Sequence, residues 1–236
     1  MSARRGRRGS VVLLSGGMDS ATCLAIASRA HRPVHALTVL YGQRHAREVR
    51  AAVALAQRYG VEAHRVVRLP LAPLLPSALT DRRRRIPSRG VRPGRIPPTY
   101  VPARNTILLA IALGYAEGHG LDRIYLGANA IDYSGYPDCR PAFLRAFERL
   151  ARVGTKAGVE GTSRLTVEAP LLASSKAEIV RRGERLRVPW ALTWSCYEGG
   201  RRPCGVCDSC RLRARGFADA GVPDPLTAAA HTRTVK

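Results

Sequence analysis

Long hydrophobic runs are missing from this 236-residue sequence, and none approaches the ~18–20 residues that cross a bilayer. The basic first residues are followed by no long apolar stretch and by no small-residue cleavage site. We therefore expect a soluble, cytoplasmic protein that contacts no membrane. A hydrophobic content of 45% excludes a disordered chain, and the length is enough for one large domain or for a domain plus an appendage.

Lysine and aromatic residues are also scarce. Only three of the 39 basic residues are lysines, and the net charge is +22. Such a charge is typical of proteins that bind nucleic acids. However, aromatic residues make up only 6% of the chain, and no arginine-rich face with interleaved aromatics is evident for stacking bases. We favour a coding bias toward arginine over a nucleic-acid function, although the charge would still attract anionic nucleotides.

Six cysteines are present, and four of them lie close together as Cys196-x7-Cys204-x2-Cys207-x2-Cys210. In a cytosolic protein such a cluster indicates a metal site rather than disulfides. Four thiolates suit a tetrahedral Zn²⁺, and no further ligand is apparent, so the site is expected to be closed and structural. The spacing alone excludes neither an iron–sulfur cluster nor four free thiols.

The remaining pattern alternates strands with helices. Strands are predicted at 10–14, 34–40, 61–69, 123–126 and 165–168, and helices at 21–29, 46–59, 105–119, 141–153 and 174–186. This rhythm predicts an α/β fold with a parallel sheet covered by helices on both faces. A proline- and arginine-rich segment, 70–98, interrupts it. We expect a nucleotide-binding domain over 10–190, a zinc-binding segment over 191–220, and flexible tails over 1–9 and 221–236.

A glycine loop, Ser15-Gly-Gly-Met-Asp-Ser20, follows the first strand and opens a helix. Its spacing is neither that of a Walker A loop nor G-x-G-x-x-G. Glycines let the backbone approach a ligand closely, and a helix N-terminus attracts phosphate oxygens. The loop resembles that of the PP-loop ATP pyrophosphatases, which cleave ATP to AMP and pyrophosphate.

This resemblance implies a Rossmann-like (adenine nucleotide alpha hydrolase-like) fold and the binding of ATP with Mg²⁺. The residues that it places at the nucleotide are Leu14, Ser15, Gly16, Gly17, Met18, Asp19, Ser20, Ala21 and Thr22. Among them, Ser15, Asp19 and Ser20 are candidate catalytic residues, with Asp19 oriented toward Mg²⁺ or the loop.

Further segments resemble one branch of this superfamily, the 7-cyano-7-deazaguanine synthases. They are 41–45 (YGQRH), 99–105 (TYVPARN), 132–140 (DYSGYPDCR), 170–171 with 175–179 (SKAEI), and 193–197 (TWSCY) leading to the cysteines. The resemblance implies that 7-carboxy-7-deazaguanine and ammonia become the nitrile through two ATP-dependent adenylations. It also implies a homodimer and no requirement for nucleic acid. No glutaminase segment is evident, so free ammonium is the expected nitrogen donor.

Each matching segment supplies candidate residues. Arg104 is expected to bind a carboxylate or phosphate, and Lys176 a phosphate or the adenylate; both are candidate catalytic residues. Candidate substrate-binding residues are Tyr41, Gln43, Arg44, His45, Asn105, Asp132, Tyr133, Tyr136, Asp138 and Arg140.

Within segment 132–140, Tyr133 or Tyr136 is expected to stack on the deazaguanine. Asp132 or Asp138 would accept hydrogen bonds from its guanine-type edge, and Arg140 would pair with its carboxylate. An ordinary turn-rich connector is the alternative for this segment.

Two other functions remain open from the sequence. The basic charge favours a PP-loop enzyme that modifies tRNA by thiolation or lysidine formation, although no additional RNA-binding domain is evident. A zinc-ribbon nucleic-acid binder on an inactive nucleotide fold is the non-enzymatic alternative, and the intact loop at 15–20 argues against it.

Overall fold

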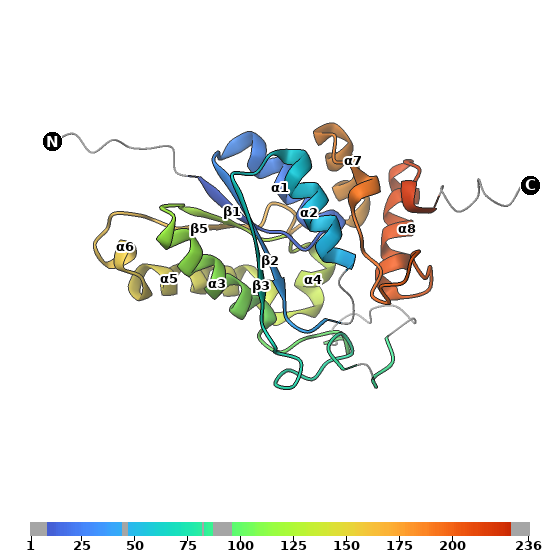
Figure 1. The fold of residues 1–236 in the computed structure, drawn as a ribbon, viewed down its shortest axis with the longest axis horizontal. Coiled ribbons are helices and arrows are strands. Elements are labelled where there is room, and N and C mark those ends of the chain that lie inside the picture. Colours follow the sequence, from blue (N-terminus) through green and yellow to red (C-terminus); the bar gives the residue numbers. More distant parts are fainter. Residues whose placement is uncertain (1–8, 44–46, 82, 87–95, 228–236) are drawn as a thin grey trace, which may run out of the picture.

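The computed structural model describes residues 9–43, 47–81, 83–86 and 96–227. Its centre is a five-stranded sheet in the order β3-β2-β1-β4-β5, with every neighbouring pair parallel (Figure 1). The strands are β1 (Ser10–Leu13), β2 (Val34–Leu40), β3 (Ala63–Arg68), β4 (Arg123–Tyr125) and β5 (Thr166–Glu168). The predicted α/β fold with a parallel sheet is confirmed.

Eight α-helices are described, with short 3₁₀ turns at Pro137–Cys139 and Trp190–Leu192. They are α1 (Met18–Ala30), α2 (Arg47–Tyr59), α3 (Arg104–Gly118), α4 (Ala130–Gly135), α5 (Pro141–Gly154), α6 (Lys156–Val159), α7 (Lys176–Leu186) and α8 (Asp208–Ala220). Among the described helices, none is both long and apolar enough to traverse a bilayer.

The helices cover both faces of the sheet, because alternate residues of each buried strand point to opposite sides. Val12 and Leu14 join one core cluster with residues of α1, α2, α7 and α8. Val11 and Leu13 join a second cluster with residues of α3 and α5. Figure 1 shows the sheet between these two layers.

The order of the strands creates a switch point between β1 and β4, where the connections leave toward opposite faces. Gly127, just after β4, lies against the start of α1: a Cβ there would be only 3.1 Å from the Ser20 nitrogen. This close approach brings the segment after β4 beside the glycine loop. Ligands of open α/β sheets bind at such a point.

The structure also differs from the sequence expectation in its helices. Helix α1 begins at Met18 rather than residue 21, and helices α4, α6 and α8 were not predicted. Residues 221–227 belong to the segment expected to be a tail, yet Val222 and Leu226 pack against the core clusters and Asp224 is buried. Their order comes from contacts with α8, which a local reading of the sequence does not reveal.

Candidate active site

The glycine loop between β1 and α1 has a conformation that only glycine tolerates at one position. Gly16 has a φ of +88°, and a Cβ there would lie 2.4 Å from the carbonyl oxygen of Glu48. The Trp194 amide donates a 2.8 Å hydrogen bond to the Gly16 carbonyl, which fixes the loop from the other side. The hydroxyls of Ser15 and Ser20 lie 3.1 Å apart. These contacts fix the conformation of the loop where it leads into α1.

A network of hydrogen bonds between acidic, basic and amide side chains lies beside the loop. The Lys176 ammonium donates to Asp19 Oδ2 at 2.6 Å, and Asn129 Nδ2 donates to the same oxygen at 3.1 Å and to Asp132 Oδ2 at 2.6 Å. Burial raises the pKa of Asp132 to about 6, although Lys176 opposes this shift. Burial also opposes the charge on Lys176, but Asp19 and Asp132 outweigh it and raise the lysine pKa.

The second carboxylate oxygen of Asp19, Oδ1, is buried and has no hydrogen-bond partner among the described residues. A buried, unpaired carboxylate oxygen is costly unless a ligand satisfies it. A carboxylate oxygen is a ligand that Mg²⁺ prefers, and the helix N-terminus and Lys176 beside it attract phosphate oxygens, so the position fits a cation–phosphate group.

A cavity of about 270 Å³ joins these groups to the other candidate residues. The predicted nucleotide-site residues that line it are Leu14, Ser15, Gly17, Met18, Asp19 and Ser20. Its walls also include Tyr41, Gln43, Arg104, Asn105, Asp132, Tyr136 and Lys176. Segments that are far apart in the sequence therefore meet at one site, as expected for the carboxyl ends of parallel strands.

Arg104 is the first residue of α3, and it forms a hydrogen bond with Tyr41 at the cavity wall. The preceding residue, Ala103, has a left-handed conformation (φ 53°) that turns the chain sharply into the helix. Tyr136 completes this wall: its hydroxyl lies 2.9 Å from the Thr99 hydroxyl. An arginine and a tyrosine ring thus border the same space, a combination suited to an aromatic acid.

Some predicted residues lie elsewhere. Gly16, Ala21 and Thr22 are buried and do not line the cavity; Thr22 donates to the Met18 carbonyl inside α1. Arg140 is exposed at the start of α5 and does not line the cavity.

Asp138 does not line the cavity either, because its carboxylate accepts a hydrogen bond from the Asn105 backbone. The Asn105 amide N–H donates to Asp138 Oδ2 at 2.9 Å, which satisfies the N-terminus of α3. Arg44, His45 and the side chain of Tyr133 lie outside the described residues.

Cys139 lines the cavity but is a poor nucleophile. Burial raises the pKa of its thiol to about 12, and Asn105 Nδ2 donates to the sulfur at 3.0 Å. Because the thiolate is the nucleophilic form of cysteine, this group is expected to act as part of the wall.

The four clustered cysteines converge as their spacing predicted. The sulfurs of Cys196, Cys204, Cys207 and Cys210 all lie within 4.8 Å of one another. Cys204 Sγ and Cys210 Sγ are 3.9 Å apart, far beyond a disulfide bond and close to the edge of about 3.8 Å that zinc–sulfur bonds of about 2.3 Å give in a tetrahedron. Backbone amides also donate to the sulfurs of Cys196 and Cys204. The cluster can hold a metal ion.

Comparisons with known proteins identify the family of this chain. Residues 9–221 match the family described as queuosine biosynthesis protein QueC. The chain belongs to the QueC family. It is 57% identical over 227 residues to 7-cyano-7-deazaguanine synthase of Anaeromyxobacter sp. (strain Fw109-5), covering 94% of this chain and 97% of the relative. It is 56% identical over 216 residues to the enzyme of that name from Nitrosospira multiformis, covering 91% and 92%.

Among solved structures, NMN synthetase from Francisella tularensis is similar in fold. The TM-score is 0.51 at 15% sequence identity, and the match covers 98% of this chain and 86% of the other. This likeness supports the Rossmann-like architecture of the QueC-family chain and nothing about its substrate.

Sequence reasoning missed several residues at the site of this QueC-family chain. Glu48, Asn129, Trp194 and Tyr197 contribute to the cavity or its network. Trp194 and Tyr197 flank Cys196 in segment 193–197, whose sequence alone assigns no role to either residue. Glu48 lies three residues beyond the YGQRH segment. Its position in the first turn of the helix that follows β2 is the feature of the sequence that indicates a place near the site.

Proposed function

We propose that this chain converts 7-carboxy-7-deazaguanine and ammonia to 7-cyano-7-deazaguanine at the expense of ATP. One observation carries the proposal: a single cavity joins the glycine loop and Lys176 to a wall with Arg104 and Tyr136. The first part suits the phosphates of a nucleotide, and the second suits an aromatic carboxylic acid. Membership of the QueC family supports the same reaction.

In this proposal, ATP binds with its phosphates against the loop and the N-terminus of α1. The side chains of Ser15 and Ser20 and the amide of Gly17 offer hydrogen bonds, and Lys176 offers a positive charge. The unpaired oxygen of Asp19 fits Mg²⁺, which binds one or two carboxylates together with phosphate oxygens. The metal would neutralise charge on the departing pyrophosphate.

The acid lies against the wall that contains Arg104 and Tyr136. Arg104 pairs with its carboxylate and holds that group toward the α-phosphate of ATP. Tyr136 stacks on the ring or borders its edge. Of the two predicted acceptors for the guanine-type edge, Asp132 lines the cavity whereas Asp138 is held by Asn105, so we assign that role to Asp132.

The chemistry then takes two similar steps. A carboxylate oxygen attacks the α-phosphorus, pyrophosphate leaves, and ammonia displaces AMP to give the amide. The amide oxygen attacks a second ATP, pyrophosphate leaves again, and loss of AMP and a proton produces the nitrile. The protein positions the reactants and stabilises the charge that develops on the phosphates, for which Arg104 and Lys176 are placed.

The cysteine cluster would hold Zn²⁺ through four thiolates, with a structural role. The metal would tie segment 196–207 to the start of α8. Free ammonium as nitrogen donor, a homodimeric state and a cytoplasmic location also belong to this proposal, as the resemblance implies. Sedimentation of the purified protein tests the dimer, and metal analysis tests the zinc.

Mass spectrometry tests the reaction. The purified protein is incubated with 7-carboxy-7-deazaguanine, ammonium and MgATP in the absence of RNA. We expect the 7-cyano product together with AMP and pyrophosphate, and the same product when the amide replaces the acid. Formation of AMP without the nitrile would indicate that the enzyme adenylates a different substrate, and tRNA would be tested next. A failure to use the amide would refute the two-step scheme.

A further inference from the structure

The cavity contains an acid that the scheme above does not use. Glu48 lies in the first turn of α2, is only partly exposed, and lines the cavity. The other carboxylates of the lining are engaged elsewhere, since Asp19 pairs with Lys176 and Asp132 accepts from Asn129. Glu48 is therefore the acid of the described lining that lies away from the phosphate network.

Its backbone is fixed relative to the glycine loop. The carbonyl oxygen of Glu48 occupies the space that a Cβ on Gly16 would need, so the first turn of α2 packs directly on the loop. The side chain lies within electrostatic reach of Arg104 and Tyr41. Burial raises the pKa of Glu48 to about 7, although Arg104 opposes that shift.

The wall around Arg104 is unfavourable for a cation. Lys176 and Arg213 also line the cavity, but Lys176 pairs with Asp19 and Arg213 with Asp224, so the charge that Glu48 faces is that of Arg104. Ammonium must nevertheless enter and reach the carbon of the activated acid. A carboxylate beside Arg104 would offset the repulsion at the point where the nitrogen is needed.

We infer that the Glu48 carboxylate binds the ammonium ion and holds it beside the acyl group that Arg104 orients. This inference rests on the proposed function. It assigns the nitrogen donor to the wall formed by α2 and the start of α3. Bound ammonium loses one proton to the Glu48 carboxylate, and the ammonia that results attacks the acyl carbon and displaces AMP. The arrangement therefore places the nitrogen and the electrophile together before reaction, which is a main source of rate in such a transfer.

A different role for Glu48 would be purely structural, as a partner that neutralises buried Arg104. The two roles differ in what the side chain recognises. If Glu48 binds ammonium, its substitution impairs only the reaction with the positively charged nitrogen donor. If Glu48 is a structural partner of Arg104, its substitution impairs every reaction at the site.

The experiment uses the full chain, its Glu48→Gln variant and two nitrogen nucleophiles. Ammonium chloride is varied at saturating MgATP and acid, with potassium chloride holding the ionic strength constant. Hydroxylamine, which is uncharged near neutral pH, replaces ammonium in a parallel series. It attacks the same adenylate through nitrogen and displaces AMP, so the product is a hydroxamate that mass spectrometry detects.

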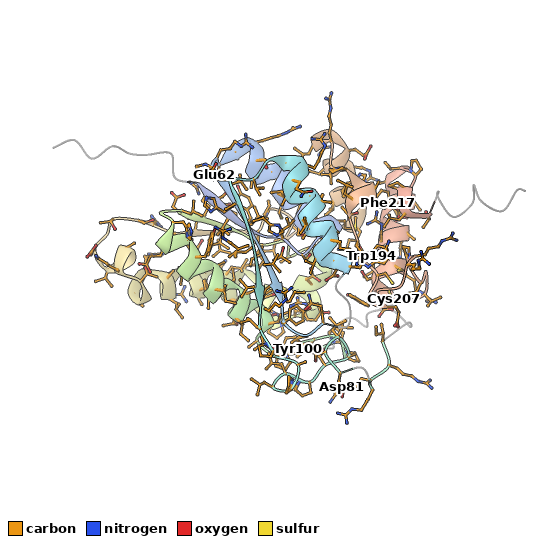
Figure 2. The ribbon with its side chains drawn as sticks, in the orientation of Figure 1. Glu62, Asp81, Tyr100, Trp194, Cys207 and Phe217 are labelled. Carbon is orange, nitrogen blue, oxygen red and sulfur yellow. The ribbon has the colours of Figure 1, made fainter. Side chains whose placement is uncertain are left out.

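We expect Glu48→Gln to raise the KM for ammonium by about 10- to 100-fold, as for the loss of one hydrogen bond to a charged group. The KM for ATP and the rate with hydroxylamine should stay within about twofold of the parent, because neither depends on a cation site. Glu62→Gln removes the same charge at an exposed position just before β3, at the other end of the sheet, and should change neither series (Figure 2).

Glu48→Asp provides a second test if the glutamine variant is poorly folded, which its melting temperature would reveal. It keeps the charge on a shorter side chain and should fall between the parent and Glu48→Gln for ammonium. Equal losses with both nucleophiles, or no change with either, would overturn the inference. A parent protein that forms neither nitrile nor hydroxamate would instead refute the proposed function.

Discussion

A buried ion pair ties the last described residues to α8, and its removal gives a measurable prediction. Arg213 donates to both carboxylate oxygens of Asp224, at 2.8 and 2.9 Å, and the two side chains are only 4% and 5% exposed. Removing one partner of a buried pair costs about 3–5 kcal/mol, because the other charge stays buried without compensation.

The local contacts of Arg213 refine this magnitude for Asp224→Ala. Its guanidinium also donates to Thr193 Oγ1 at 2.7 Å and lies 5.0 Å from the Phe217 ring, so part of its charge stays satisfied. We therefore expect a loss of about 3 kcal/mol, at the lower end of that range. For a chain of this length, each kcal/mol lowers the melting temperature by about 2–4 °C, so the expected fall is about 6–12 °C.

Thermal unfolding followed by circular dichroism measures this effect, and α8 offers a matched control. Asp219 forms an exposed i,i+4 pair with Arg215, whose side chains are 55% and 81% exposed. Such a pair contributes about 0.3–0.5 kcal/mol, so Asp219→Ala should lower the melting temperature by only about 1–2 °C.

The double variant Arg213→Met with Asp224→Leu removes both charges and should recover much of the stability lost by Asp224→Ala. If Asp224→Ala melted no lower than Asp219→Ala, the pair would not hold residues 221–227 in place, and the reasoning would be wrong.

Three further predictions concern the site. Asp19→Asn should abolish pyrophosphate release, because it removes the charge that pairs with Lys176 and fits Mg²⁺; an unchanged melting temperature would show that the fold is intact. Cys207→Ser should lower both the melting temperature and the zinc content, and one zinc per chain in this variant would contradict the four-thiolate site. Asp132 has a pKa raised to about 6, so its ionisation opposes folding. Stability from this group is present at low pH and declines as pH rises from about 4 to about 6, by about 1–3 kcal/mol in total. Asp132→Asn should remove that decline in unliganded protein, and urea titrations at several pH values would contradict the assignment if both proteins declined equally.

Much of the fold could be predicted because the strands and long helices carry local signals. The apolar runs of β1 and β2 and the glycine loop that follows β1 place the first parallel unit without tertiary information. Helix α8 is not predicted from the sequence, because it is rich in arginine and directly follows the cysteine segment. Its buried face is identified only by the packing of Phe217 in the core.

The site was harder to predict in detail, because a motif gives the residue types but not their directions. Segment 132–140 contains both Asp132, which lines the cavity, and Asp138, which satisfies the N-terminus of α3. The chain leaves α4 and turns through Pro137–Cys139, so neighbouring polar residues point to different surroundings. Arg140 is directed to solvent by the same turn, and Arg104, from another segment, occupies the wall instead.

The cysteine segment is connected to the glycine loop through Trp194. Trp194 lies two residues before Cys196, donates from its amide to the Gly16 carbonyl, and donates from its ring nitrogen to the Cys196 carbonyl at 3.1 Å. Figure 2 shows Trp194 and Cys207 near each other between α2 and α8. A change in the position of the four cysteines would therefore alter the glycine loop, because the two hydrogen bonds of Trp194 link Cys196 to Gly16. A metal ion held by the four cysteines would stabilise the conformation of the glycine loop as well as the fold. The four cysteines do not line the cavity, but Ser195 and Tyr197, the neighbours of Cys196, do.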